Sequence, residues 1–114
     1  NYINAHGTST PAGDHVELES IKEVFKDKIP PISSTKSQTG HTLGAAGALE
    51  SIFSLLMLKN SFMSKTLNLS SSTDEGEGLD LVSEVRNQDL DAVMNNSFGF
   101  GGTNVSLVFE KLKS

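Results

Sequence analysis

Two histidines lie in polar segments that follow short apolar runs, and imidazole side chains can donate hydrogen bonds or move protons. His6 precedes a glycine and several hydroxyl residues, and His41 follows Gly40. Because α/β folds gather ligands where their strands end, we expect both histidines to face one crevice. Either one alone is more often a hydrogen-bonded structural residue.

A lysine and a glutamate accompany these histidines. Lys36 lies five residues before His41, and Glu50 interrupts a run that is otherwise apolar. A carboxylate in such a run is costly to bury unless a cation or N–H donors meet it, so Lys36 is the natural partner of Glu50. The alternative is that Glu50 faces solvent on one polar stripe of its helix.

A metal centre is disfavoured by the same residues. The third histidine, His15, begins an amphipathic segment and is interpreted as a surface residue. No two histidines share a helical i,i+4 face, and the chain has no cysteine, so the pattern lacks the features of a zinc site.

The segment Phe98-Gly99-Phe100-Gly101-Gly102 could be a phosphate-binding loop or a hairpin turn. A phosphate loop needs a helix after the glycines, whereas here apolar residues alternate from Val105 to Phe109 as in a strand. The pattern therefore favours a hairpin turn, with the rings of Phe98 and Phe100 available to form the wall of a pocket.

The elements that must position these residues follow from periodicity and from turn residues. Leu18, Ile21 and Phe25 have the spacing of one helix face, and Asp14 with Glu17 resembles a capping box at its start. The expected order is a strand at 2–5, a helix at 14–27, a strand at 32–35, a loop at 36–41, a helix at 42–59, an exposed acidic connection at 70–78, and strands at 92–97 and 103–109.

The segment 42–59 is apolar nearly all round, so we expect a helix that is buried on most sides. Gly44 and Gly47 near its start suggest close packing against another element. A membrane span is the competing interpretation, but Glu50, Ser51 and Ser54 interrupt the run.

Composition limits the function classes. The chain has fourteen acidic and nine basic residues and a formal charge of −5, which disfavours broad binding to nucleic acid or to an anionic membrane. Its 114 residues suit one globular unit. It begins with Asn1 rather than Met, so it could be a piece of a longer protein, and no signal or transit segment is visible in it.

Three motifs together resemble a known family. Residues 6–14 (HGTSTPAGD), 36–47 (KSQTGHTLGAAG) and 96–104 (NSFGFGGTN) resemble the C-terminal signatures of β-ketoacyl-acyl carrier protein synthases. Residues 54–58 and 93–94 look more like synthase I than synthase II. The resemblance implies an α/β, thiolase-like fold, of which residues 1–114 form part of the C-terminal half. That part has a mixed sheet, a buried central helix and an outer amphipathic helix.

The resemblance also implies roles for the histidines and their neighbours. His6 and His41 match the two catalytic histidines, which stabilise an enolate oxygen as hydrogen-bond donors. Lys36 organises the site, with Glu50 as its support. Phe100 matches the residue whose backbone N–H joins the oxyanion hole and whose ring gates the acyl pocket.

Further roles concern substrate and ion binding. Thr8 and Thr10 match positions whose hydroxyls bind the pantetheine arm, beside the pocket wall that Phe98 would form. Some members of the family hold a monovalent cation, and no other cofactor is expected. The positions that bind this cation match Asn4, Glu50, Asn95 and Asn96 in this chain.

The implied activity is fatty acid chain elongation, in which an acyl group condenses with malonyl-acyl carrier protein after loss of carbon dioxide. The acyl group would sit on a cysteine in an N-terminal half outside this chain, so the chain alone is predicted to be inactive. The expected partners are acyl carrier protein and a second copy of the full protein. The expected place is the cytoplasm, or an organelle if a targeting segment precedes the chain. The alternative is a non-catalytic thiolase-like subunit or binding domain.

Overall fold

The structure is a computed structural model that describes residues 1–8, 11–66, 79–99 and 102–112. The expected acidic connection at 70–78 lies outside the described residues, as do Thr10 and Phe100.

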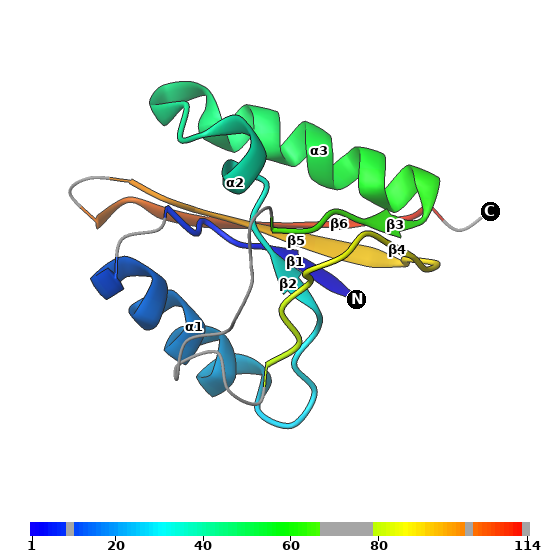
Figure 1. The fold of residues 1–114 in the computed structure, drawn as a ribbon, viewed down its shortest axis with the longest axis horizontal. Helices are drawn as coiled ribbons and strands as arrows, with labels where there is room; N and C mark the ends of the chain where they lie inside the picture. Colours follow the sequence, from blue (N-terminus) through cyan, green and yellow to red (C-terminus); the bar gives the residue numbers. More distant parts are fainter. Residues whose placement is uncertain (9–10, 67–78, 100–101, 113–114) are drawn as a thin grey trace.

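A mixed sheet of four strands forms the centre of the fold, in the order β2-β1-β5-β6 (Figure 1). Its strands are β1 (Tyr2–Asn4), β2 (Ile32–Ser33), β5 (Ala92–Phe98) and β6 (Asn104–Glu110). β1 runs parallel to both β2 and β5, and β5 pairs with β6 in an antiparallel hairpin. The two expected strands are therefore confirmed as an antiparallel pair, while Phe100 and Gly101 of the expected glycine turn lie outside the described residues.

Helices cover both faces of the sheet. Figure 1 shows α3 (Ala46–Asn60) above the sheet and α1 (Pro11–Phe25) below it. The one-turn helix α2 (Lys36–Thr39) and a 3-10 turn (Leu43–Ala45) lead from β2 into α3. A small antiparallel pair, β3 (Phe62–Met63) with β4 (Arg86–Asn87), lies beside the end of α3.

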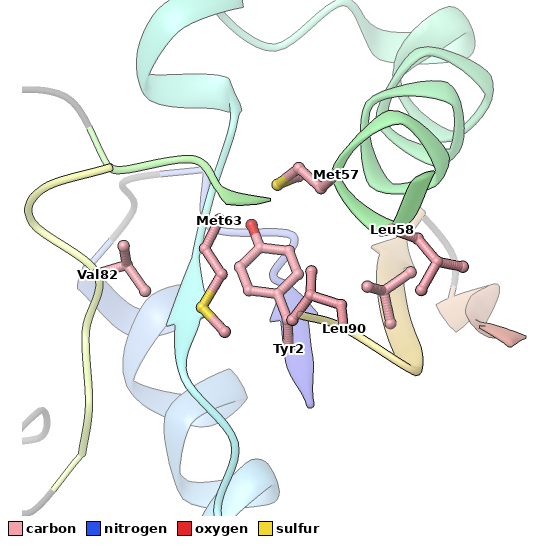
Figure 2. Packing of buried hydrophobic residues seen from close by; sticks show 7 residues of the cluster. Tyr2, Met57, Leu58, Met63, Val82 and Leu90 are labelled. Carbon is pink, nitrogen blue, oxygen red and sulfur yellow. The ribbon is translucent and has the colours of Figure 1, made fainter. Parts of the chain in front are cut away.

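Alternation along β1 divides the core into two clusters. Tyr2 points toward α3 and packs with Met57 and Leu58, as Figure 2 shows, whereas Ile3 points toward α1 and packs with Ile21. Fully burying each such apolar side chain contributes about 1.5–3 kcal/mol. The two clusters fix α3 and α1 to opposite faces of the same strand.

Several expected boundaries differ in the structure: β1 ends at Asn4, β2 ends at Ser33, and α3 runs from Ala46 to Asn60 after a 3-10 turn. α1 begins at Pro11 rather than at Asp14, because proline is well suited to the first helical position, where a backbone N–H has no helical partner. It ends at Phe25, where Lys26 takes a left-handed conformation with φ 55°. The segment 36–41, expected to be a loop, contains the helical turn α2.

The expectation that the second helix is buried on most sides is met on one face only. Its buried residues face the sheet, but Ile52, Leu55 and Leu56 are 52%, 43% and 46% exposed in this chain. Gly47 does approach a neighbour, since an added Cβ would lie 3.4 Å from Ser97 Oγ, whereas Gly44 has open space. Among the described residues, every helix is too short or too polar to cross a membrane.

We expect the isolated chain 1–114 to bind a hydrophobic dye through the exposed face of α3, because neighbouring apolar side chains there are open to water. The double variant Ile52→Ser, Leu55→Ser should lower dye fluorescence several-fold. The matched control is Val16→Ser, Val24→Ser on α1, which should not. A monomeric chain 1–114 that melts sharply without binding dye would contradict this expectation.

Candidate active site

The candidate site lies where three parallel strands end at one edge of the sheet. His6 follows β1, Lys36 follows β2, and Phe98 is the last residue of β5. His41 comes directly after α2 and Gly40. The ring centroids of His6 and His41 are 5.5 Å apart, with the rings nearly perpendicular at 86°. The expected convergence of the two histidines is confirmed.

The Phe98 residue contacts His6 through both its ring and its backbone. The two ring centroids are 5.3 Å apart, and the Phe98 backbone N–H donates to His6 Nδ1 at 3.3 Å. Because Nδ1 accepts this bond, the proton of a neutral His6 lies on Nε2, which is then a donor. The hairpin therefore selects the tautomer of His6.

The charge state of His6 also favours its action as a hydrogen-bond donor. Partial burial lowers the pKa of His6, and the electrostatic effects of the neighbouring Lys36 and His41 lower it further. A lowered pKa keeps the imidazole neutral near pH 7, so Nε2–H acts as a hydrogen-bond donor rather than as an acid.

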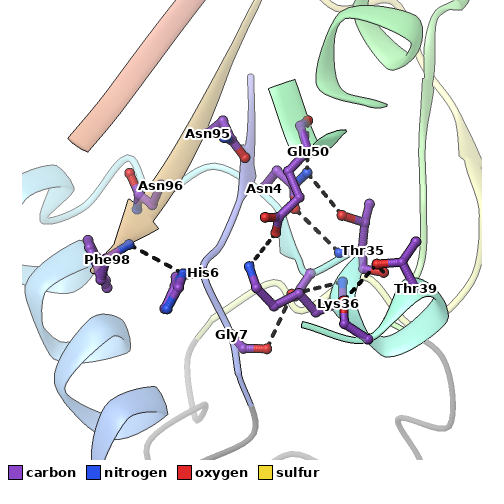
Figure 3. A network of polar contacts seen from close by, with 12 residues as sticks. Asn4, His6, Gly7, Thr35, Lys36, Thr39, Glu50, Asn95, Asn96 and Phe98 are labelled. Atoms are coloured by element: carbon purple, nitrogen blue, oxygen red, sulfur yellow. Dashed lines mark hydrogen bonds and ion pairs between the residues drawn. The ribbon is translucent and has the colours of Figure 1, made fainter. Parts of the chain in front are cut away.

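Lys36 and Glu50 form a buried ion pair, with Lys36 Nζ 2.5 Å from Glu50 Oε1 and both side chains almost fully buried (Figure 3). This confirms Lys36 as the partner of Glu50 and excludes a solvent-facing Glu50. Removing one member of a buried pair typically costs about 3–5 kcal/mol, because the other charge remains without a partner.

Asn4 fixes the start of α2 from the end of β1. Its Nδ2 donates to Thr35 Oγ1 at 3.3 Å and to Ser54 Oγ at 3.2 Å, and its Oδ1 accepts from the Thr35 backbone N–H at 3.4 Å. The residue is fully buried. Asn4 therefore links β1, α2 and α3 at the site.

Glu17 is the site residue that sequence reasoning assigned wrongly. It does not cap a helix: its two carboxylate oxygens accept the backbone N–H groups of His6 and Gly7, at 2.8 and 2.9 Å. Burial raises the pKa of the Glu17 carboxyl, and these N–H donors partly oppose that rise. Glu17 thus holds the loop that carries His6. Its position one residue before Leu18 on the buried face of α1 was the available signal.

Neighbouring asparagines on β5 point to opposite faces of the sheet. Asn95 faces α3, where its Nδ2 lies 3.5 Å from Ser51 Oγ, and Asn96 faces α1, where its Nδ2 lies 3.5 Å from Glu17 Oε2. The Asn96 side chain is therefore separated from the other three expected cation ligands. Asn95 Oδ1 and Glu50 Oε2 are buried oxygens without a hydrogen-bond partner in the described part of the chain.

The other expected site residues are placed as follows. Thr8 lies half-buried in the loop after His6, and His15 is exposed on α1. Thr10 and Phe100 fall outside the described residues, so the roles of their side chains stay predictions. Within the described ranges, no three His, Asp or Glu side chains gather in a way that could hold a metal ion.

Comparisons with known proteins identify chains that are similar to this one. Residues 1–70 match the family model described as β-ketoacyl synthase, C-terminal domain. The chain is 54% identical to 3-oxoacyl-[acyl-carrier-protein] synthase 1 of Escherichia coli K12 over 113 residues. It is 57% identical to the enzyme of that name from Haemophilus influenzae over 112 residues. These alignments cover 99% and 97% of the chain but 28% of each relative, and they support the greater similarity to synthase I.

Solved structures show the same fold. A β-ketoacyl synthase from Burkholderia phymatum matches with a TM-score of 0.89 at 42% identity, over 98% of this chain and 28% of that chain. The ketosynthase of a type II polyketide synthase, solved in complex with its acyl-carrier protein, matches with a TM-score of 0.93 at 32% identity. That match covers 99% of this chain and 28% of the other. The expected α/β, thiolase-like fold is confirmed.

We expect Glu17→Ala to destabilise the protein by about 2 kcal/mol or more, because two partly buried N–H groups lose their acceptor. Glu17→Gln keeps one acceptor oxygen and should lose less. Urea unfolding of the full-length protein measures both variants. The matched control is Glu19→Gln, an exposed position on the same helix, and an equal loss there would contradict the role of Glu17.

The sign of the pH dependence follows from the raised pKa of Glu17. The folded state binds this proton more tightly than the unfolded state, so stability falls as the pH rises from about 4.5 through the raised folded pKa. Glu17→Gln should remove this contribution. The free energy of unfolding, measured across that pH range, provides the test.

Proposed function

The chain belongs to the β-ketoacyl synthase family, and on that premise we propose that the full protein elongates fatty acyl chains by decarboxylative condensation. Residues 1–114 supply the two histidines of the active site, and the acyl group is carried by a cysteine outside this chain, which has none. The perpendicular meeting of His6 and His41 carries the proposal.

The first chemical step is loss of carbon dioxide from a malonyl thioester. The carbon–carbon bond to the carboxylate breaks, and its electron pair becomes an enolate whose negative charge lies on the thioester oxygen. N–H donors from His6 and His41 that point at this oxygen stabilise the charge as it develops, each by about 3 kcal/mol. His6 is prepared for this role because its Nδ1 already accepts the Phe98 N–H.

In the second step, the enolate carbon attacks the acyl carbonyl and the cysteine thiolate leaves. The oxyanion of that step would be bound by the backbone N–H of Phe100, by analogy with the family. Phe98 would form one wall of the acyl pocket, and Thr8 and Thr10 would bind the pantetheine arm.

Lys36 acts on the histidines without reacting itself. Its ammonium is held by Glu50 and its charge contributes to the lowered pKa of His6. It is therefore a positioning and electrostatic residue, which keeps the imidazole neutral beside the reacting thioester.

We also propose the partners of the full protein. One relative in structure is a ketosynthase solved in complex with its acyl-carrier protein, which supports acyl carrier protein as the substrate carrier here. A homodimer in the cytoplasm is part of the same proposal. A non-catalytic subunit is the competing function, and a cysteine in the preceding half of the polypeptide would distinguish the enzyme from it.

We expect His6→Ala and His41→Ala each to slow decarboxylation of malonyl thioester by about 10²–10³-fold in the full-length protein, because each removes one donor to the enolate oxygen. Carbon dioxide release measures the rate. His15→Ala is the control and should keep the parent rate, since His15 is an exposed residue of α1. A parent-like rate in His41→Ala would remove the donor role from the mechanism.

The pH profile gives a second expected outcome. Because the pKa of His6 is lowered, the rate of decarboxylation should begin to fall on the acid side only at a pH below the ordinary histidine pKa of about 6.5. This fall is the acid limb of the pH profile. Lys36→Met removes one cause of that lowering, so the limb should shift toward higher pH. An unchanged limb in Lys36→Met would mean that the lysine charge does not act on His6.

We further propose that a monovalent cation binds beside the ion pair, held by oxygens of Asn4, Glu50 and Asn95. The two buried oxygens without hydrogen-bond partners, Glu50 Oε2 and Asn95 Oδ1, support this proposal, since a cation would satisfy both. The ion would supply positive charge that stabilises the folded arrangement of β1, β5 and α3 and would take no part in bond making.

We expect potassium chloride to raise the Tm of the full-length protein above its value in choline chloride at equal ionic strength. Asn95→Leu should abolish this difference, because it removes one oxygen ligand. Asn96→Leu is the matched control and should retain the difference, because its side chain faces the other side of the sheet. An equal Tm of the parent in both salts would exclude the ion.

A further inference from the structure

One residue beside the site has a backbone conformation that its place in the fold does not explain. Leu43, two residues after His41, takes a positive φ of 54°. In this left-handed region the Cβ of any residue other than glycine lies too close to its own backbone, and a bulky residue there is an outlier. Strained torsions of this kind gather at functional sites, where the surrounding structure holds them.

The two other non-glycine residues with positive φ in the described part of the chain have an ordinary explanation. Lys26, with φ 55°, directly follows α1, and Ser61, with φ 56°, is the C-cap of α3. Helices commonly end on one left-handed residue, because that turn satisfies a carbonyl group of the last helical turn. Leu43 lies instead at the start of the 3-10 turn that leads into α3, so capping does not account for its positive φ.

The segment that carries His41 is a short link between two helical elements that are held in place (Figure 1). The ion pair of Lys36 with Glu50 holds α2, and packing against Tyr2 of β1 holds α3. Residues 40–45 must join the end of one to the start of the other. Because both ends of this link are held, the torsions within it determine which way the His41 ring points.

His41 depends on these torsions more than His6 does. The ring of His6 accepts a hydrogen bond from the Phe98 N–H, whereas no hydrogen bond reaches His41 within the described ranges. Positive φ values lie on both sides of His41, at Gly40 with 73° and at Leu43. A negative φ at Leu43, as in an ordinary helix, would rotate the preceding chain by about 120° about the N–Cα bond and turn the His41 ring away from its present direction.

Glycine is the usual residue at such a torsion, and leucine differs from it in a way that matters here. Gly40 takes its positive φ without strain, but glycine also has access to a wide range of other torsions. A residue with a Cβ has only a small allowed well at positive φ. Once the neighbouring structure has placed Leu43 in that well, the leucine keeps the torsion within a narrower range than glycine would.

We propose that Leu43 is a positioning residue for His41, whose narrow left-handed backbone well fixes the direction of the second imidazole. The backbone torsion acts, and the apolar side chain beyond Cβ does not. Any residue that has a Cβ and is held in the same well should therefore serve. The effect on turnover rests on the proposed function of the histidines, whereas the effect on the ring of His41 does not.

The test compares Leu43→Gly with Leu43→Ala in the full-length protein, because both remove the apolar side chain and only the first removes Cβ. In Leu43→Gly, kcat for decarboxylation of malonyl thioester should fall about 3–10-fold with KM unchanged, since the donor is bound in the site but less well directed. Leu43→Ala should stay close to the parent in both constants. Leu43→Asn should do the same, because asparagine tolerates the left-handed region.

The matched controls are Lys26→Gly and Ser61→Gly, which make the same backbone change at the left-handed residues that end α1 and α3. Both should keep the parent kcat. Equal loss of kcat in Leu43→Gly and Leu43→Ala, or a parent kcat in Leu43→Gly, would overturn the proposal. A Tm of Leu43→Gly far below that of Leu43→Ala would also overturn it, since glycine takes this torsion without strain. If Leu43→Ala does not fold, Leu43→Asn takes its place.

A readout that is independent of turnover is the NMR signal of the His41 ring in protein labelled with ¹³C at histidine Cε1. It is identified as the signal that His41→Ala lacks. In Leu43→Gly this signal should shift and broaden, and in Leu43→Ala and Ser61→Gly it should keep its parent position and width. An unchanged signal in Leu43→Gly would exclude the positioning role. Failure of the proposed function is distinguishable, because the parent would then show no decarboxylation while the ring signal still responds.

Discussion

The buried pair between Lys36 and Glu50 is the constraint on which the site depends. Two opposite charges removed from water must stay together, because either one alone would be far more costly there. The pair joins a single helical turn, which its own few hydrogen bonds could not hold in place, to the long helix α3. Asn4 adds a neutral link to the same turn. His41 follows this turn directly, so its position is determined by contacts made deep in the molecule.

The two histidines are fixed from opposite faces of the sheet by two different glutamates. Glu50 on α3 holds the segment before His41, and Glu17 on α1 holds the backbone at His6. The strand β1 lies between these helices, and its residues alternate between the two core clusters. Packing of α1 and α3 against one strand is therefore what sets the distance between two rings that come from separate loops.

Local rules predicted part of this arrangement. The convergence of His6 and His41 followed from their places after strand ends, and the pairing of Glu50 followed from the cost of a buried carboxylate. Glu17 was misassigned because the sequence resembles a capping box, while its true acceptor role depends on a loop ten residues earlier. The helical turn at Lys36 was missed because distant residues stabilise it. The exposed side of α3 could not be predicted either, since periodicity reports apolar faces and not what covers them.

The hairpin of β5 and β6 makes the site sensitive to chain length as well as to side-chain type. The side chains of the adjacent residues Asn95 and Asn96 point to helices on opposite faces of the sheet. Asn96 pairs with Ser106 on β6, whose hydroxyl donates to the Asn96 side chain. A single inserted or deleted residue before them would exchange their directions, so that each amide would meet the wrong helix. Evolution of this segment can therefore vary its side chains far more easily than its number of residues.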